Sequence, residues 1–126
     1  MATQGNQIRQ TFVAGADLSA KQYTFVTCNG VTADGENRTV VSPAAGAKAD
    51  GVVINNPGNT YAATVVVFGR TKVKAGGAIP AGAEVQTNAN GQVVAATTGI
   101  RVGKALEAAV ANQIITIDFY PGGNAA

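Results

Sequence analysis

Short turn signals rich in Gly, Asn and Pro divide this sequence into segments too short for most helices. They are CNG at 28–30, DGEN at 34–37, NPGN at 56–59, NANG at 88–91 and PGGN at 121–124. Between them lie runs of strand length that are rich in β-branched and aromatic residues. These runs are QYTFVTC (22–28), RTVVS (38–42), GVVIN (51–55), ATVVVFG (63–69), TKVKA (71–75), GQVVAA (91–96) and IITIDFY (114–120). The pattern predicts an all-β fold, a small antiparallel β-sandwich or β-barrel-like domain.

In two of the runs, the order of apolar and polar residues predicts which faces of the strand are buried. In 114–120, Ile115, Ile117 and Phe119 share one face, which predicts a strand with a core side and a wetter side. In 64–68 both faces are apolar, so this strand should be covered on both sides, by the core and by a second sheet or a neighbouring subunit.

With 126 residues, the chain fits one domain with one core. The predicted β domain covers residues 15–121. Residues 1–14 show little pattern and are interpreted as an extended N-terminal arm, and residues 122–126 as a C-terminal tail. Within 75–96, we expect a tight connection anchored by Ile79 and a hairpin turn at TNANG.

Two segments are ambiguous. Residues 104–112 contain good helix formers, but a helix of this length is marginal alone, and Ile100, Val102, Leu106 and Ala108 alternate in a way that favours a strand. Asp17 could cap one helical turn before the 22–28 run, or it could lie in a plain loop.

The chain offers little catalytic chemistry. It has no His, so Ser19, Ser42 and the lone Cys28 lack the usual general base, and Cys28 is interpreted as a packed strand residue. The nearest pair of carboxylates, Asp34 and Glu36, is explained by a turn, and without EF-hand spacing the same loop is a weak calcium candidate. We therefore expect no enzyme activity, no cofactor and no metal.

The P-loop pattern fails around Gly103-Lys104, because its first glycine falls on Thr98 and Ala105 replaces Ser or Thr.

The net charge argues against binding to polyanions, and the lengths of the apolar runs argue against a membrane span. Nine Lys and Arg against seven Asp and Glu give a net charge of +2, too low for a dense nucleic-acid face. No apolar run is long enough for a membrane span, and the first residues lack the charged-then-apolar pattern of a secretory leader, so we expect no export by that route. Arg70, Lys72 and Lys74 should project from one face of a strand. They either keep an edge strand from pairing or form a positive stripe for an acidic partner, with protein favoured over nucleic acid.

The order of the segments resembles a known family. A GV strand at Gly51-Val52 is followed by a V.V.G...V segment from Val65 to Val73, by AGGAIPAGAEVQTNANGQVVAA at 75–96, and by VGKALEAA at 102–109 with a final strand. This order, from about Ala16 to Pro121, is similar to that of the small cement or decoration proteins of tailed-phage and prophage capsids. The link before the last strand lacks the glycine that the family pattern has there.

The resemblance implies a structural protein on the outer surface of an assembled capsid, made in the host cytoplasm and often trimeric. It would bridge neighbouring major capsid protein subunits and so stabilise the shell. We expect capsid or inter-subunit contacts at Ile8, Arg9 and Phe12 of the arm and at the Arg70, Lys72 and Lys74 stripe. An alternative is a small β-sandwich module that recognises carbohydrate or a host surface, although only Tyr23, Tyr61 and Tyr120 could offer a platform.

Overall fold

The computed structural model describes residues 7–32, 35 and 37–120, and within them the chain forms strands, turns and loops without a helix. The strands are β1 (Gln7–Ala14), β2 (Thr24–Val31), β3 (Arg38–Val41), β4 (Gly51–Val53), β5 (Ala62–Lys74), β6 (Glu84–Thr87), β7 (Val93–Ala95), β8 (Gly103–Ala105) and β9 (Ile114–Phe119). The predicted all-β class is confirmed.

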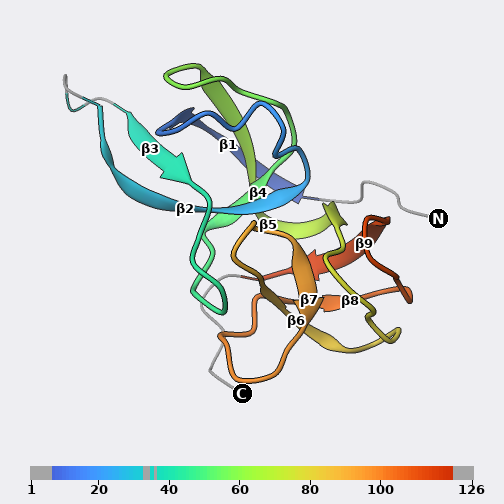
Figure 1. Ribbon diagram of the computed structural model, residues 1–126. Helices are drawn as coiled ribbons and strands as arrows, with labels where there is room; N and C mark the ends of the chain where they lie inside the picture. The colour runs from blue at the N-terminus through green and yellow to red at the C-terminus, as the bar shows by residue number, and fades with distance from the viewer. Residues whose placement is uncertain (1–6, 33–34, 36, 121–126) are drawn as a thin grey trace.

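A closed barrel forms the first lobe, drawn in the upper part of Figure 1. Its strand order is β1-β3-β2-β4-β5, and an additional pairing between β1 and β5 closes the ring. The β1–β3 pair is parallel and the other pairs are antiparallel. Closure leaves the strands of this ring without a free edge.

The second lobe, in the lower part of Figure 1, is built on the other half of β5. Here the order continues from β5 through β9, β8 and β6 to β7. A parallel bridge between Ala75 and Val93 brings β7 back to the end of β5, and the Gly76 amide donates a hydrogen bond to the Val93 carbonyl at 2.7 Å. The long strand β5 is therefore common to two rings.

A bulge in β5 lets one strand serve both rings. Ile8 of β1 lies opposite Phe68, but the next residue, Arg9, lies opposite Val66, so Val67 is an extra residue in β5. Val66 lies opposite Val52 of β4, which belongs to the second core, so Val66 is on the side of β5 that faces this core. Val73 belongs to the same core. These two valines are an odd number of positions apart, so strict alternation would place them on opposite faces.

Each lobe has its own core, and the wall between them is buried on both faces. Phe25 and Val52 face the second core, while their neighbours Val26 and Val53 face the first. The Phe25 ring lies 6.0 Å from the Phe119 ring of β9, centroid to centroid. This aromatic pair joins β2 of the barrel to the second lobe.

The predicted cover of the 64–68 run is confirmed for its first residues. Val65 is 1% exposed and Val66 is fully buried, with the second lobe providing the cover rather than a neighbouring subunit. Phe68 differs, because it lies beyond the bulge and is 53% exposed.

Several boundaries differ from those expected. The runs 63–69 and 71–75 form one strand, β5. Residues 104–112 contain no helix, and β8 covers their first positions. The expected alternation does not hold there, because Val102 is buried whereas Leu106 is 38% exposed. The Ser19 amide donates to Asp17 Oδ1 in a loop at 3.0 Å, so Asp17 caps no helical turn.

The second half of the expected N-terminal arm belongs to the barrel. Residues 7–14 form β1, which pairs with both β3 and β5 and places Phe12 and Ala14 in the first core. Burial of these two side chains explains why the segment is a strand of the barrel. Residues 1–6 and the expected tail at 122–126 lie outside the described residues.

The 75–96 stretch agrees with expectation. Ile79 is 2% exposed and belongs to the second core, and β6 and β7 form an antiparallel hairpin around the 88–91 turn.

The joint between the lobes can be tested with matched phenylalanines. Phe25→Ala should lower the free energy of unfolding by about 3–5 kcal/mol, since the ring is fully buried. Phe68→Ala, at an exposed ring, should cost less than about 1 kcal/mol. Urea denaturation followed by fluorescence or circular dichroism measures both, and equal costs would contradict the assigned joint.

Close packing of β4 on β5 gives a second test. A Cβ on Gly51 would lie 2.7 Å from the Val66 carbonyl oxygen, whereas a Cβ on Gly77 would meet only the Val94 side chain, at 3.9 Å. Gly51→Ala should therefore destabilise the fold by about 1–3 kcal/mol. Gly77→Ala should stay within about 0.5 kcal/mol of the unaltered chain in the same denaturation experiment.

Candidate functional site

Groups that could perform catalysis are dispersed. No group of three or more Cys, Asp or Glu side chains gathers into a metal site within the described ranges. The Asp50 carboxylate accepts hydrogen bonds from the Thr27 hydroxyl at 2.9 Å and the Cys28 amide at 2.8 Å. Partial burial and the negative charge of Asp50 raise the pKa of the Cys28 thiol, so it stays protonated at neutral pH.

Asp34 and Glu36, the carboxylates of the calcium candidate loop, lie outside the described residues. Among the described residues, none belongs to a helix with the length and apolar character needed to span a bilayer.

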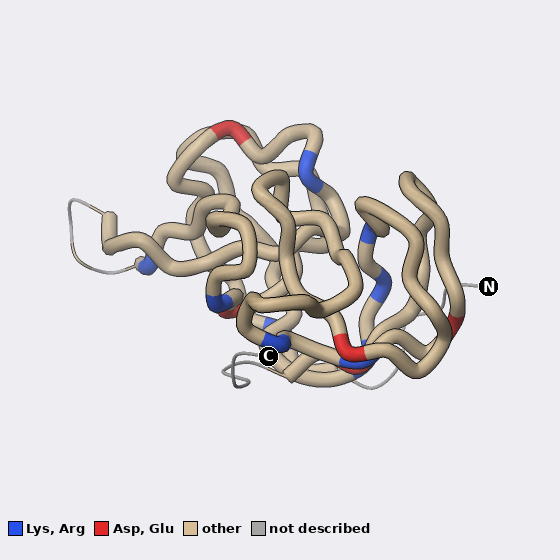
Figure 2. Tube along the Cα trace, turned by 60° about the horizontal axis from the view of Figure 1, so that its bottom comes forward, with Lys and Arg blue, Asp and Glu red and all other residues tan. Residues whose placement is uncertain are grey.

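Charged side chains form a row of alternating sign across the outer face of the second lobe. Asp118 of β9 lies opposite Arg70 of β5 and Lys104 of β8, and Lys104 lies opposite Glu84 of β6. Arg70 Nε is 3.0 Å from Asp118 Oδ1, and Arg101 Nη1 is 3.4 Å from Glu84 Oε1. Figure 2 shows Lys and Arg positions spread along the trace with acidic positions among them, unlike the dense face of a nucleic-acid binder.

The predicted basic stripe has the expected direction. Thr71 and Val73 are buried, and Arg70, Lys72 and Lys74 project from the opposite face of β5. β5 as a whole lies between β4 and β9 in the strand order. In the 70–74 half, to which the edge-strand interpretation applies, β5 pairs with β9 on one side, whereas β1 and β4 pair with earlier residues of β5. Lys72 Nζ lies 5.8 Å from the centre of the Tyr23 ring, at cation–π distance.

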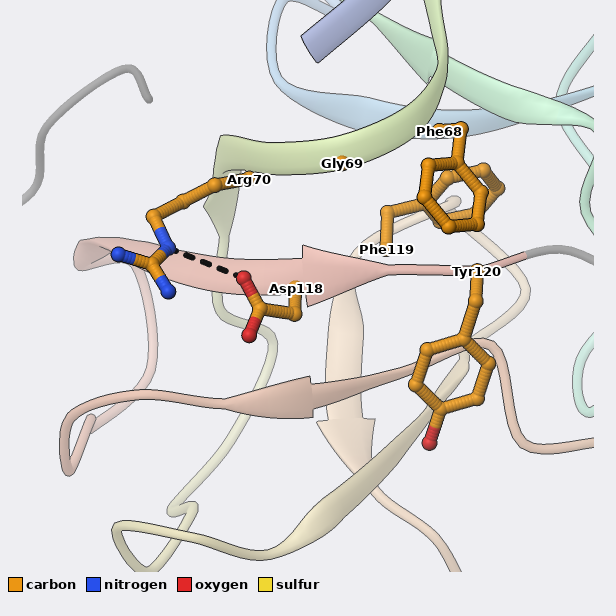
Figure 3. Close-up of a pocket in the computed structure, with 6 residues that line it drawn as sticks. All are labelled: Phe68, Gly69, Arg70, Asp118, Phe119 and Tyr120. Carbon is orange, nitrogen blue, oxygen red and sulfur yellow. Dashed lines mark hydrogen bonds and ion pairs between the residues drawn. The ribbon is translucent and has the colours of Figure 1, made fainter. Parts of the chain in front are cut away.

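A half-open hollow of about 430 Å³ lies where the two lobes meet at β5. It is lined by Phe68, Gly69, Arg70, Asp118, Phe119 and Tyr120. Figure 3 shows the Arg70–Asp118 pair at one end of the hollow and the aromatic residues at the other. Ile8, which is 58% exposed and lies opposite Phe68, extends the apolar rim.

The expected contact residues of the N-terminal segment have different positions. Ile8 and Arg9 are exposed on β1, so both are available to a partner. Phe12 is only 8% exposed and packs in the first core.

Comparison with known proteins adds information on the fold. No protein-family model matches the sequence, and no curated protein is significantly similar to it. A solved structure does match, "The crystal structure of head fiber gp8.5 N base in bacteriophage phi29", with a TM-score of 0.73 and 18% identity. The match covers 90% of this chain and 94% of that chain. The two chains share a fold.

Sequence reasoning found the stripe but missed the hollow. Phe68 lies in an apolar run and Asp118 on the more polar face of a strand. Nothing in either segment indicates that the two residues line the same hollow. The two sides of the hollow come together only through the register in which Gly69 lies opposite Phe119 and Arg70 opposite Asp118.

The contribution of the Arg70–Asp118 pair can be measured with a double-mutant cycle. The two side chains are 50% and 43% exposed, so the coupling between Arg70→Ala and Asp118→Ala should be about 0.2–1 kcal/mol. It should fall further in 1 M salt. The cycle of Lys48→Ala with Asp118→Ala serves as the control and should show no coupling, and a coupling of several kcal/mol at Arg70 would contradict the exposed geometry.

Proposed function

We propose that this chain is a structural protein of a phage virion that binds the outer surface of the assembled capsid. It would bridge neighbouring major capsid protein subunits and so stabilise the shell against the pressure of packaged DNA. The observation that carries this proposal is the fold shared with the N base of a phage head fiber over nearly the whole of both chains. The order of sequence segments that resembles capsid cement proteins supports the same placement independently.

The physical character of the surface supports a mechanical role. A protein present in many copies on a symmetric shell can stabilise it through many weak contacts, because avidity multiplies modest affinities. Exposed apolar side chains are available for such contacts, for example Ile8 at 58%, Phe68 at 53% and Val110 at 58%. The two-ring scaffold would hold them in fixed positions.

No enzymatic activity or cofactor is part of the proposal. Two of the described carboxylates, Asp118 and Glu84, are engaged in ion pairs, and Asp50 binds a backbone amide and a hydroxyl. Asp17 accepts a hydrogen bond from the Ser19 amide. These contacts support structural roles for the four carboxylates.

A homotrimer on the capsid is the proposed assembly, made in the host cytoplasm before it joins the virion. A three-fold arrangement would match the local symmetry at which neighbouring capsid subunits meet, so that one assembly could bridge several of them.

One observation favours a second function, binding of a carbohydrate or host surface. The hollow combines the aromatic side chains of Phe68 and Tyr120 with the polar Arg70–Asp118 pair, an arrangement suited to stacking and hydrogen bonding of a sugar ring. Phe68→Ala separates the two proposals: loss of glycan binding with intact capsid binding would assign the hollow to the host.

The capsid proposal is tested by mixing the purified chain with expanded capsids that lack it. We expect saturable binding with a copy number matched to capsid symmetry and a higher temperature of capsid disruption, measured by calorimetry. An unrelated β protein of similar size provides the control. Absence of saturable binding would contradict the proposal.

A further inference from the structure

The outer face of the second lobe mixes cations with exposed apolar side chains. Across β5 and β9, Lys74 lies opposite Ile114 and Lys72 opposite Thr116. On the other side of β9, the Leu106 amide donates to the Thr116 carbonyl at 3.1 Å. Ile114 and Leu106 are therefore near neighbours on either side of Thr116, and they are 37% and 38% exposed.

We call this surface the β9 face. It comprises Lys72, Lys74, Lys104, Leu106 and Ile114. Lys104 joins it because it lies opposite Asp118, which is on the same face of β9 as Thr116 and Ile114. Val110, which is 58% exposed, lies in the loop that precedes β9, where its carbonyl accepts a hydrogen bond from the Gln113 amide at 3.2 Å.

The β9 face carries an excess of positive charge. Of the nearby carboxylates, Asp118 and Glu84 are paired with Arg70 and Arg101, and Glu107 accepts a hydrogen bond from the Thr116 amide at 3.3 Å. Lys74 and Lys104 form no ion pair with any residue in the described part of the chain. These two ammonium groups are therefore available to carboxylates of a partner.

The β5 border of this face is held in position by the loop before β2. The Tyr23 carbonyl accepts a hydrogen bond from the Lys74 amide at 2.7 Å, and the Tyr23 ring lies under Lys72. Tyr23 adopts a φ of 64°, a backbone conformation that is uncommon for a bulky residue and is kept only where the surroundings enforce it. The cations thus project from a fixed framework.

We propose that the β9 face docks on a protein surface of the capsid that presents Asp and Glu side chains around exposed apolar residues. This inference rests on the proposed function and names the surface and the partner chemistry. Charge complementarity selects the acidic partner. The apolar side chains between the cations favour protein over nucleic acid, because a phosphate backbone would leave Leu106 and Ile114 without an apolar contact.

The test is a charge-reversal variant, Lys74→Glu with Lys104→Glu, in the binding assay with capsids that lack the chain. We expect the apparent Kd to rise at least about tenfold, because attraction becomes repulsion at two points of the interface. Binding of the unaltered chain should weaken as salt increases. The matched control, Arg38→Glu with Lys48→Glu, changes the net charge equally at exposed positions outside the β9 face.

A second variant tests the apolar part of the face. Leu106→Ser should weaken capsid binding several-fold, and this loss should depend little on salt because it concerns apolar contact. Thermal unfolding of each variant shows whether the fold is retained.

Each alternative outcome has a defined meaning. If the unaltered chain binds capsids and the Lys74/Lys104 variant binds equally well, the docking proposal fails while the proposed function stands. An equal loss in the Arg38/Lys48 variant would also overturn it, since net charge alone would explain binding. Loss of self-association, or of duplex DNA binding, only in the Lys74/Lys104 variant would assign the face to a second copy or to nucleic acid. If the unaltered chain does not bind capsids, both proposals fail.

Discussion

The architecture depends on one strand that takes part in two rings. β5 closes the first barrel through β1 and begins the second lobe through β9, and the extra residue Val67 changes which side of the strand faces the second core. Without that bulge, the side of β5 that carries Val66 would bring Lys72 and Lys74 toward an apolar core. Burial of these two ammonium groups in an apolar core would be prohibitive, so the bulge is a condition for the fold and for the cationic surface.

Strands β2 and β4 act as a wall between the lobes. They carry apolar residues on both faces because each face meets a different core, as Val52 and Val53 do on adjacent positions of β4. Such a wall couples the lobes by direct packing, and the Phe25–Phe119 contact adds an aromatic joint. The proposed role on a capsid would use this rigidity, because surface groups that bind a symmetric shell must keep fixed positions.

Local sequence patterns were sufficient for part of this structure. β3, β4 and β9 were evident because β-branched runs alternate between turn signals, and the 88–91 turn marked the β6–β7 hairpin. β1 was missed, because its first residues are exposed on both faces and only Phe12 and Ala14 reach the core. Neither the bulge at Val67 nor barrel closure has a local signature, since both arise from pairing between β1 and β5.

The surface, too, could be predicted from the sequence only where neighbouring residues in one strand determine it. The Arg70, Lys72 and Lys74 stripe was predictable from alternation alone, whereas its neighbours Ile114 and Leu106 were brought beside it by strand order. Electron cryomicroscopy of capsids mixed with the chain tests the central claim most directly. The account predicts ordered density on the outer surface that follows capsid symmetry and fits the two-lobed fold, with the β9 face toward the shell. Capsids that remain undecorated at saturating protein would contradict it.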